Sequence, residues 1–552
     1  MIVQFTLAAT STASGGPGIL EAETMWRRWS VGPARPLTCV KRETRSSQYA
    51  LIQEAATSSL AIVYASNEGE EVIATTTRMA AWASVESSIA YWTSCARMGE
   101  IWWTRAAGRE AVDGASRRRF NALVRFARRQ SPFYRDAYRG LSEHDHEPGE
   151  LPVVTKPSLM ARFDDWVTDG EIHLPAVRAF IADREHIGER YLDRYIVWKS
   201  SGSTGEPGIY VQDASALATF DALMALHLDP LRFAAGYGWD LAAHGGRAAL
   251  VAATGDHFAS IASWQRVCHS SPWIAARGFS IMDPLPRLVA ALNDYQPAFV
   301  ASYPTMLSLL AEEQEAGRLK IDPVRLWSGG ECLVADAATA IERVFRCPLT
   351  NEYGASECMS IGFGCREGWL HVNADWVLLE PVDRDYAPTP PGEASHTVLL
   401  SNLANRVQPI IRYDLGDSVI VKPEPCACGN PLLAMRVEGR RDDVLSLRGA
   451  NGRVVRLLPL ALTTIVEEAA HVHRFQIVQT GADRLMLRLE PCADDVRGTI
   501  WHAAATALRK YLQEQSLPNV HVGLDKRVPL SDRHSGKLRE VIVAIEGTPV
   551  HN

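Results

Sequence analysis

The fold of this 552-residue chain is decided by one stretch, Ser200-Ser201-Gly202-Ser203-Thr204-Gly205-Glu206-Pro207. It follows Tyr195-Ile196-Val197-Trp198-Lys199, whose β-branched and aromatic residues predict a strand. Glycines allow a ligand to approach the backbone closely, and exposed backbone N–H groups with short hydroxyls form a concave anion site. The stretch therefore predicts a loop that holds nucleotide phosphates, although a flexible Ser/Gly linker has the same composition. The Walker sequence G-x-x-x-x-G-K-[ST] is absent from it.

Composition is typical of a globular protein with more than one domain, since 47% of the residues are hydrophobic and 22% are charged. The formal net charge of −7 gives no reason to expect nucleic acid or an anionic membrane as a partner. No run of roughly 18 apolar residues predicts a membrane span, and the first residues lack the basic start of a secretory signal. We expect a cytoplasmic protein that is a monomer or homodimer.

Residues 214–350 alternate between strand-like and helix-like segments, and this alternation predicts an α/β fold with largely parallel sheets. Ligands in such folds bind at the carboxyl ends of the strands. Upstream, apolar residues from Phe120 to Ala127 recur with helical spacing, and Leu151–Lys156 reads as an extended stretch that opens a helix at Pro157–Phe163. Ile209–Asp213 reads as the strand returning from the glycine-rich loop. The segments within 214–350 are Ala248–Ala253, Ala298–Ser302 and Val324–Ser328 as strands, and Arg287–Asp294, Thr305–Ala316 and Val334–Phe345 as helices.

Four further motifs follow the glycine-rich loop. In Tyr353-Gly354-Ala355-Ser356-Glu357, an aromatic ring suits a purine and a carboxylate suits magnesium. Asp417 closes Ile410-Ile411-Arg412-Tyr413-Asp414-Leu415-Gly416-Asp417, where a carboxylate can accept ribose hydroxyl protons. Gly439-Arg440-Arg441-Asp442-Asp443 is a charged link. Ser535-Gly536-Lys537-Leu538-Arg539 places a lysine on a glycine loop, where its charge can offset that of a transition state. Each motif alone also fits an ordinary turn or a solvated surface.

Together, the five motifs resemble in order and spacing those of the acyl-adenylate-forming (ANL) superfamily. The variant details resemble the phenylacetate–CoA ligase branch and its relatives that look like deazaflavin-coenzyme adenylating synthetases, and the resemblance covers roughly residues 99–545. It implies a large N-terminal adenylate-forming domain with mixed, largely parallel sheets at 98–441 and a small mobile C-terminal α+β lid domain at 442–552. Residues 1–97 would be an N-terminal extension. The closer resemblance rests on Ser131–Tyr134, Leu151–Lys156, Arg412–Asp417 and Gly439–Asp443.

The resemblance also implies a role for each matching residue. The loop Ser201, Gly202, Ser203, Thr204 and Gly205 would hold the β- and γ-phosphates of ATP. Gly330 and Glu331 would line the adenine, Tyr353 would stack on it, and Glu357 would bind magnesium. Asp417 would bind the ribose, Arg440 the ribose or a phosphate, and Asp442 would be the hinge of the lid. Lys537 would contact the carboxylate and the α-phosphate as a catalytic residue. One departure is Gly208, which follows Pro207 where a basic residue is common.

The implied function is an AMP-forming ligase that uses ATP, magnesium and coenzyme A to activate a carboxylic acid, with an aromatic, phenylacetate-like acid as the expected substrate. His257, Phe258 and Tyr303 could line an aryl pocket, or they could be ordinary core residues. The alternatives are an adenylation enzyme that delivers the acyl group to a carrier protein or an amine, and an adenylyltransferase that acts on a coenzyme hydroxyl. A non-catalytic nucleotide-binding relative is disfavoured because Glu357, Asp417 and Lys537 are all present.

A second group of residues suggests a metal. Cys426 and Cys428 stand in a Pro/Gly-rich loop where packing does not explain two thiols, and Cys365 and His371 precede a strand-like run at Val372–Leu379. Three thiolates and one imidazole satisfy tetrahedral zinc, and four protein ligands make such a site structural, with no open position for water. Some phenylacetate–CoA ligase-like relatives look similar here and carry zinc. Reduced free cysteines are the alternative, and Cys358 is a spare candidate ligand.

Overall fold

The structure is a computed structural model that describes residues 92–142, 145–200, 207–227, 245–270, 275–438, 444–472, 474–490, 494–530 and 539–544. All of them belong to one compact unit of the chain. The predicted phosphate loop (201–205), Arg440, the hinge Asp442 and Lys537 lie outside the described residues. Their roles stay predictions.

The N-terminal part of the described chain is helical. A helix at 92–106 crosses the domain boundary predicted between residues 97 and 98. The guanidinium of Arg97 lies 4.4 Å from the ring centroid of Trp376, and Ile101 is fully buried in the main core. Arg97, the last residue of the predicted extension, therefore packs against the domain that follows, which the sequence did not reveal.

The predicted helix that ends at Ser131 is confirmed as α5 (Arg109–Gln130), which buries Phe120, Leu123 and Val124. The Ser131 side chain accepts a hydrogen bond from the Tyr134 amide and so caps α6 (Pro132–Ala137). The helix expected at Pro157–Phe163 is split into α7 (Lys156–Met160), which begins with a Thr155 capping box, and α8 (Phe163–Trp166). The short elements that follow are η1 (Pro148–Glu150), α9 (Leu174–Ala182) and η2 (Arg184–His186).

A nine-stranded sheet forms the centre of the large domain, in the order β14-β15-β10-β9-β8-β7-β6-β4-β5. One half is parallel and the other half antiparallel, so the predicted mixed α/β architecture is confirmed, with the parallel pairing confined to the strands from β8 to β5. The parallel strands are β4 (Arg247–Ala252), β5 (Ala275–Ser280), β6 (Phe299–Ser302), β7 (Arg325–Ser328) and β8 (Leu349–Ala355). The antiparallel strands are β9 (Cys358–Gly364), β10 (Leu370–Val372), β14 (Val419–Val421) and β15 (Ala434–Val437).

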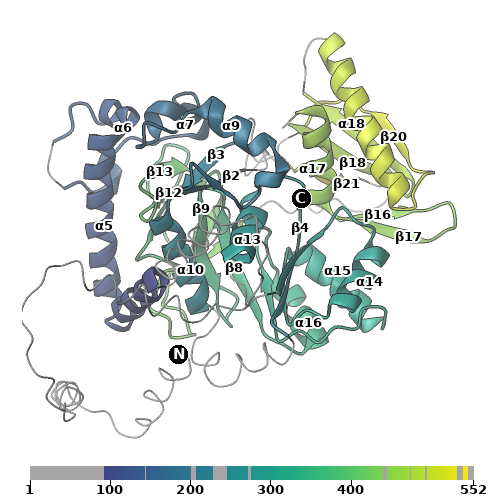
Figure 1. Ribbon diagram of the computed structural model, residues 1–552, viewed down its shortest axis with the longest axis horizontal. Coiled ribbons are helices and arrows are strands. Elements are labelled where there is room, and N and C mark those ends of the chain that lie inside the picture. The colour runs from purple at the N-terminus through teal and green to yellow at the C-terminus, as the bar shows by residue number, and fades with distance from the viewer. Residues whose placement is uncertain are drawn as a thin grey trace, which may run out of the picture. The chain divides into compact units, whose positions relative to one another are not determined.

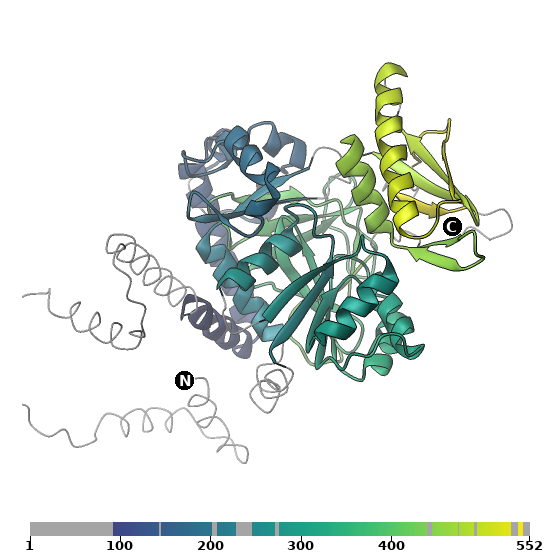
Figure 2. The same cartoon turned by 45° about the vertical axis from the view of Figure 1, so that its right-hand side comes forward.

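Both faces of the parallel half are covered by helices (Figures 1 and 2). On β4, Ala249 and Val251 belong to the core formed with α14 (Leu285–Tyr295), α15 (Pro304–Glu315) and α16 (Ala335–Phe345). Leu250 and Ala252 point to the other face, where they pack with Ile261 of α13 (Ala259–Ser270). Because alternate residues of a strand face opposite sides and both sides are dry here, the strands read as continuous apolar runs.

Two three-stranded antiparallel sheets complete the large domain. The predicted hairpin around the glycine-rich loop is confirmed by β2 (Tyr195–Lys199) and β3 (Ile209–Gln212), with β1 (Arg190–Tyr191) beside β2. The second sheet contains β11 (Val377–Val382), β12 (Thr397–Asn402) and β13 (Ile410–Asp414). The single strand-like run predicted at Val372–Leu379 is wrong, because a turn separates β10 from β11 and buries Asn373 and Asp375.

The C-terminal part has an α+β architecture, as expected for this end of the chain. Its four-stranded sheet has the order β20-β19-β18-β21 and mixes parallel with antiparallel pairs. The elements are β16 (Leu445–Arg448), β17 (Val454–Leu457), α17 (Pro459–Ala470), β18 (Phe475–Gly481), β19 (Arg484–Leu489), α18 (Asp494–Glu514), β20 (His521–Leu524) and β21 (Val541–Val543). Its mobility stays a prediction. Throughout the described ranges, no helix has the length and apolar character needed to cross a membrane.

Candidate active site and metal cluster

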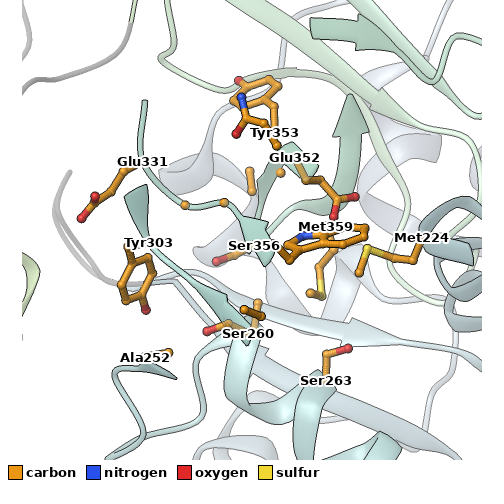
Figure 3. A pocket seen from close by; sticks show the side chains of 18 of the residues that line it. Met224, Ala252, Ser260, Ser263, Tyr303, Glu331, Glu352, Tyr353, Ser356 and Met359 are labelled. Carbon is orange, nitrogen blue, oxygen red and sulfur yellow. The ribbon is translucent and has the colours of Figure 1, made fainter. Parts of the chain in front are cut away.

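A large cleft is lined by residues that follow the carboxyl ends of β4, β6, β7 and β8 (Figure 3). Its volume is 2710 Å³, well above the roughly 300–1,000 Å³ of a pocket for one small molecule. The cleft therefore has room for more than one ligand at the edge of the sheet where α/β folds bind them.

Glu357 stands in the tight connection between β8 and β9 and is held by two tyrosines. Its Oε1 accepts hydrogen bonds from the hydroxyl of Tyr210 at 2.6 Å and of Tyr413 at 2.8 Å. Burial, and then the Glu357 charge, raises the pKa of both phenols, so they stay donors. The Glu357 carbonyl accepts from Asn402 Nδ2 at 3.0 Å, which fixes the backbone as well. Among the described contacts none goes to Oε2, so that oxygen is available to a cation.

The same connection depends on Gly354. A Cβ at this position would lie 1.9 Å from the carbonyl oxygen of Met359, a distance that no side chain tolerates. Trp198 Nε1 also donates to the Ser356 carbonyl at 2.7 Å. The glycine therefore lets β8 and β9 approach closely enough to place Glu357 on the cleft.

The structure brings Tyr353 and Asp417 together, although 64 residues separate them in the chain. The Tyr353 hydroxyl donates to Asp417 Oδ2 at 2.7 Å, and both residues line the cleft. Burial, and then the Asp417 charge, raises the pKa of Tyr353, so this hydroxyl stays a donor. The pair fixes the orientation of a carboxylate at the mouth of the site.

Gly330 and Glu331 follow β7 and also line the cleft. Gly330 has a φ of +80°, and a Cβ there would lie 3.1 Å from the ring of Tyr303. Glu331 Oε2 accepts from the amide of Thr305 at 3.1 Å and from its hydroxyl at 2.7 Å, in the first turn of α15. That carboxylate is therefore tied to a helix N-terminus, where negative charge is favourable.

Only two of the three residues expected at an aryl pocket line the cleft. Phe258 and Tyr303 line the cleft, and burial raises the pKa of Tyr303 to about 12. His257 is fully buried instead, and its Nε2 lies 2.8 Å from the carbonyl oxygen of Asp183. Burial lowers the pKa of His257, so its ring is neutral and packs in the protein interior.

The four residues predicted to hold zinc meet in one cluster. The ligand atoms of Cys365, His371, Cys426 and Cys428 all lie within 4.8 Å of one another. Cys365 follows β9 and His371 stands on β10, so a hairpin brings them together. The two thiols of Cys365 and Cys426 are 3.8 Å apart, and Cys428 Sγ lies 3.2 Å from His371 Nε2.

The surroundings of this cluster suit a metal. His371 Nδ1 lies 3.0 Å from the Leu432 carbonyl, which fixes the proton on Nδ1 and turns the Nε2 lone pair toward the thiols. Burial lowers the pKa of His371, so its ring is neutral. The Asn430 amide donates to Cys428 Sγ at 3.4 Å. Cys358, the spare candidate, is not among the clustered ligands, and burial raises the pKa of its thiol to about 12.

Several residues in or next to the cleft were missed from sequence. Tyr210 lies in the strand expected at Ile209–Asp213 and Tyr413 in the motif that ends at Asp417, and nothing in their spacing links them to Glu357. Lys199, the last residue of β2, pairs with Asp256 beside the cleft. Glu352, inside β8, did carry a signal, because a carboxylate within a buried strand needs partners.

No protein-family model matches the chain. Among curated proteins, CapK of Staphylococcus aureus is 24% identical over 205 residues, a match that spans 36% of this chain and 43% of CapK. The match thus spans less than half of that relative.

Among solved structures, the chain resembles 2-hydroxyisobutyryl-CoA ligase in complex with 2-HIB-AMP and CoA. The identity is 20% and the TM-score 0.48, over 79% of this chain and 90% of the ligase. It also resembles the adenylation domain AlmE of Vibrio cholerae in complex with glycyl-adenosine-5'-phosphate, at 16% identity and a TM-score of 0.36, over 61% and 64% of the two chains.

Proposed function

We propose that the protein is an ATP-dependent, AMP-forming ligase that activates a carboxylic acid as acyl-AMP and transfers the acyl group to coenzyme A. The proposal rests on one observation: two carboxylates whose orientation is fixed by hydrogen bonds line the same cleft. Glu357 is held by two phenols and Asp417 by a third. A magnesium nucleotide needs one carboxylate for its metal and another for its ribose, and the motifs that supply both are the ones that resemble the superfamily.

The residues of the five motifs have separate parts in the proposed reaction. Glu357 Oε2 would hold magnesium, which offsets the charge of the phosphates when bound. Asp417, oriented by Tyr353, would accept hydrogen bonds from the ribose hydroxyls. Gly330, which has no side chain to occupy the space beside Tyr303, would leave room for the adenine. The loop 201–205 would cradle the phosphates, and Arg440 would contact the ribose or a phosphate.

The proposed chemistry has two steps. An oxygen of the acid attacks the α-phosphorus of ATP in line, and pyrophosphate leaves as the acyl–oxygen–phosphorus bridge forms. Lys537 would offset the charge that builds up at the phosphorus. The sulfur of the acceptor thiol then attacks the acyl carbon, the bond from that carbon to the bridging oxygen breaks, and AMP leaves. Rotation of the C-terminal domain about Asp442 would separate the steps.

The acid is proposed to be aromatic and phenylacetate-like, because Phe258 and Tyr303 offer rings on a cleft that Met224 and Met359 also line. Coenzyme A is proposed as the acceptor because the variant motifs resemble those of phenylacetate–CoA ligases. A carrier protein, an amine or a coenzyme hydroxyl is the alternative acceptor.

ATP–pyrophosphate exchange across aryl and fatty acids, followed by AMP release with and without coenzyme A, tests the proposal. Exchange that requires an acid, with AMP release that requires coenzyme A, is the expected result. Exchange with no response to coenzyme A would favour a carrier protein or an amine as acceptor. Absence of exchange with every acid would overturn the ligase function.

We also propose that Cys365, His371, Cys426 and Cys428 hold one structural zinc. The shared position of the four ligand atoms and the hydrogen bond that fixes the His371 tautomer support it. Elemental analysis should find one zinc per chain, and Cys428→Ser should lose it and melt at a lower temperature. The loss of zinc binding should cost about 4 kcal/mol at a free zinc concentration of 1,000 times Kd. Cys268→Ser, at a thiol outside the cluster, is the control, and a zinc-free protein of unchanged stability would contradict the proposal.

A further inference from the structure

A second glutamate of the cleft, Glu352, takes no part in the proposed nucleotide site. It stands on β8, five positions before Glu357, and its side chain is 7% exposed. Figure 3 shows Glu352 beside Met224 and Met359, in the part of the cleft away from Glu331 and Tyr303. A carboxyl group among apolar side chains is costly to bury, so its presence in the wall of a ligand cleft requires a reason.

Neutral partners hold Glu352 in place. The Ser360 hydroxyl donates to Glu352 Oε1 at 2.6 Å, and the side chain of Trp327 is a second neutral neighbour. The Ser360 hydroxyl can donate in this direction because it accepts from Asn373 Nδ2 at 3.1 Å. Among the described residues, no arginine or lysine contacts Glu352, so the carboxyl lacks the cation that would stabilise a buried charge.

The same network fixes the histidine behind Glu352. Asn373 Nδ2 is a donor, so its Oδ1 is the acceptor that lies 3.3 Å from His227 Nε2. The proton of His227 is therefore on Nε2, and Nδ1 carries a buried lone pair with no hydrogen-bond partner. That nitrogen lies 3.8 Å from Glu352 Oε1. An anionic carboxylate would face a lone pair there, whereas a neutral carboxyl can direct its proton toward it.

A neutral Glu352 with its proton turned toward His227 presents an accepting oxygen to the cleft. Burial raises the pKa of Glu352 to about 8, in agreement with this arrangement. An accepting oxygen in an apolar wall loses hydration when a ligand enters, and only a ligand that donates a hydrogen bond makes up the loss.

We propose that Glu352 is a specificity-determining residue that selects acids whose tail carries an uncharged hydrogen-bond donor, a hydroxyl or an aryl amine. The inference rests on the proposed function, since it names the class of acid that the ligase activates. Met224 and Met359 would contact the apolar body of the acid, and Glu352 would accept the hydrogen bond from its polar end. An acid of the same shape without the donor would leave the buried oxygen unpaired.

Matched acids test the proposal in ATP–pyrophosphate exchange with the full chain. The series consists of phenylacetates with hydrogen, hydroxyl, amino, methyl or methoxy at each ring position, together with ω-hydroxy and plain aliphatic acids. The methoxy group is similar in size to the donors but only accepts. The best hydroxy or amino acid should exceed its hydrogen, methyl and methoxy analogues in kcat/KM by at least about tenfold, because the analogues leave a buried acceptor unpaired.

Variants assign the preference to Glu352. Glu352→Leu should lower kcat/KM for the donor acid by at least about tenfold while leaving the hydrogen analogue unchanged or improved. Glu352→Gln, which is close in shape, should keep the preference for a donor but raise kcat/KM for the methoxy acid, because its amide N–H can donate. Glu313→Leu removes a carboxylate that is 9% exposed, bonds Arg318 and lies outside the cleft, so it should leave the preference unchanged.

The outcomes separate this inference from the ligase function. Exchange that occurs equally well with donor and non-donor acids, or a donor preference that survives in Glu352→Leu, overturns the inference and leaves the ligase standing. If Glu352→Leu does not fold, an unchanged response of Glu352→Gln to the methoxy acid overturns it instead. Absence of exchange with every acid overturns both.

Discussion

Two glutamates five residues apart, Glu357 and Glu352, line the same cleft in opposite chemical settings. Glu357 receives two phenolic hydrogen bonds on one oxygen and has the other oxygen available to a cation. Glu352 receives one hydrogen bond, from a serine, lies beside the indole of Trp327 and faces the lone pair of His227. In the proposed function, the same side chain would hold a metal in one place and act as a neutral acceptor in the other.

The difference shows that the partners of a carboxyl group, more than its place in a motif, set what it can do. Donors alone stabilise a carboxylate, whereas burial beside an unprotonated nitrogen favours the acid. One end of the cleft is thus suited to phosphate chemistry and the other to the recognition of an uncharged group. The substitutions below separate the two ends, beginning with the largest expected effect.

Lys537→Ala should have the largest effect, because it removes the positive charge proposed at the α-phosphate. We expect ATP–pyrophosphate exchange to fall by about 10²–10³-fold, while ATP binding measured by calorimetry changes little. Lys510→Ala, at an exposed position of α18, is the matched control and should resemble the unmodified protein. Exchange at the unmodified rate in Lys537→Ala would remove this lysine from the proposed mechanism.

Glu357→Gln should come next, since it replaces the proposed metal ligand by a neutral amide that keeps the shape. Exchange should fall by about 10²-fold at ordinary magnesium concentrations and recover in part as magnesium is raised. Glu352→Gln is the internal control, because it should leave the magnesium dependence unchanged. Equal magnesium dependence in the two variants would contradict the proposal that Glu357, and not Glu352, binds magnesium.

Tyr210→Phe removes one of the two donors to Glu357 Oε1 and should have a smaller effect. A hydrogen bond to a charged group contributes about 1.5–3 kcal/mol, so we expect a loss of about tenfold or somewhat more in exchange. Tyr413→Phe should act similarly, and the double variant should lose more than the product of the two, because each tyrosine still pairs the shared acceptor when the other is removed. Strictly multiplicative losses would show that the tyrosines act independently.

Glu352→Gln should also change how stability depends on pH. The pKa of Glu352 is raised from 4.5 to about 8 in the folded protein, so folding takes up a proton between these values. The unmodified protein should therefore lose stability as pH rises through this window. The Tm of Glu352→Gln minus that of the unmodified protein should grow by at least about 2 °C from pH 5 to pH 8 and then level off. A difference that stays constant with pH would show that Glu352 is already ionised.

The sequence predicted the architecture better than the contacts of the site. Apolar runs with turn signals located the strands and helices of the parallel half, because local patterning determines such elements. The motifs located Glu357, Tyr353 and Asp417, since each stands at or just after the end of a strand. The hydrogen bonds from Tyr210 and Tyr413 to Glu357, and the bond from Tyr353 to Asp417, join segments far apart in the chain. No pattern in a single sequence links such segments.

The misplaced expectations have similar causes. His257 was grouped with Phe258 because they are adjacent, yet neighbours at the start of a helix point in different directions. The boundary at residue 97 followed composition, whereas the helix at 92–106 is set by its packing against the main core. The four residues proposed to hold zinc were grouped correctly in space, because the thiols of a Pro/Gly-rich loop have few other uses.

An isotope label can show whether an acid oxygen attacks the α-phosphorus of ATP. An acid that supports exchange is prepared with oxygen-18 in both positions of its carboxyl group. It is incubated with the protein, ATP, magnesium and coenzyme A, and the mass of the AMP product is measured by mass spectrometry. The proposed mechanism predicts one oxygen-18 atom in each AMP, because the bridging oxygen stays bonded to phosphorus when the acyl group is transferred to the thiol. AMP without the label, or ADP as the nucleotide product, would contradict it.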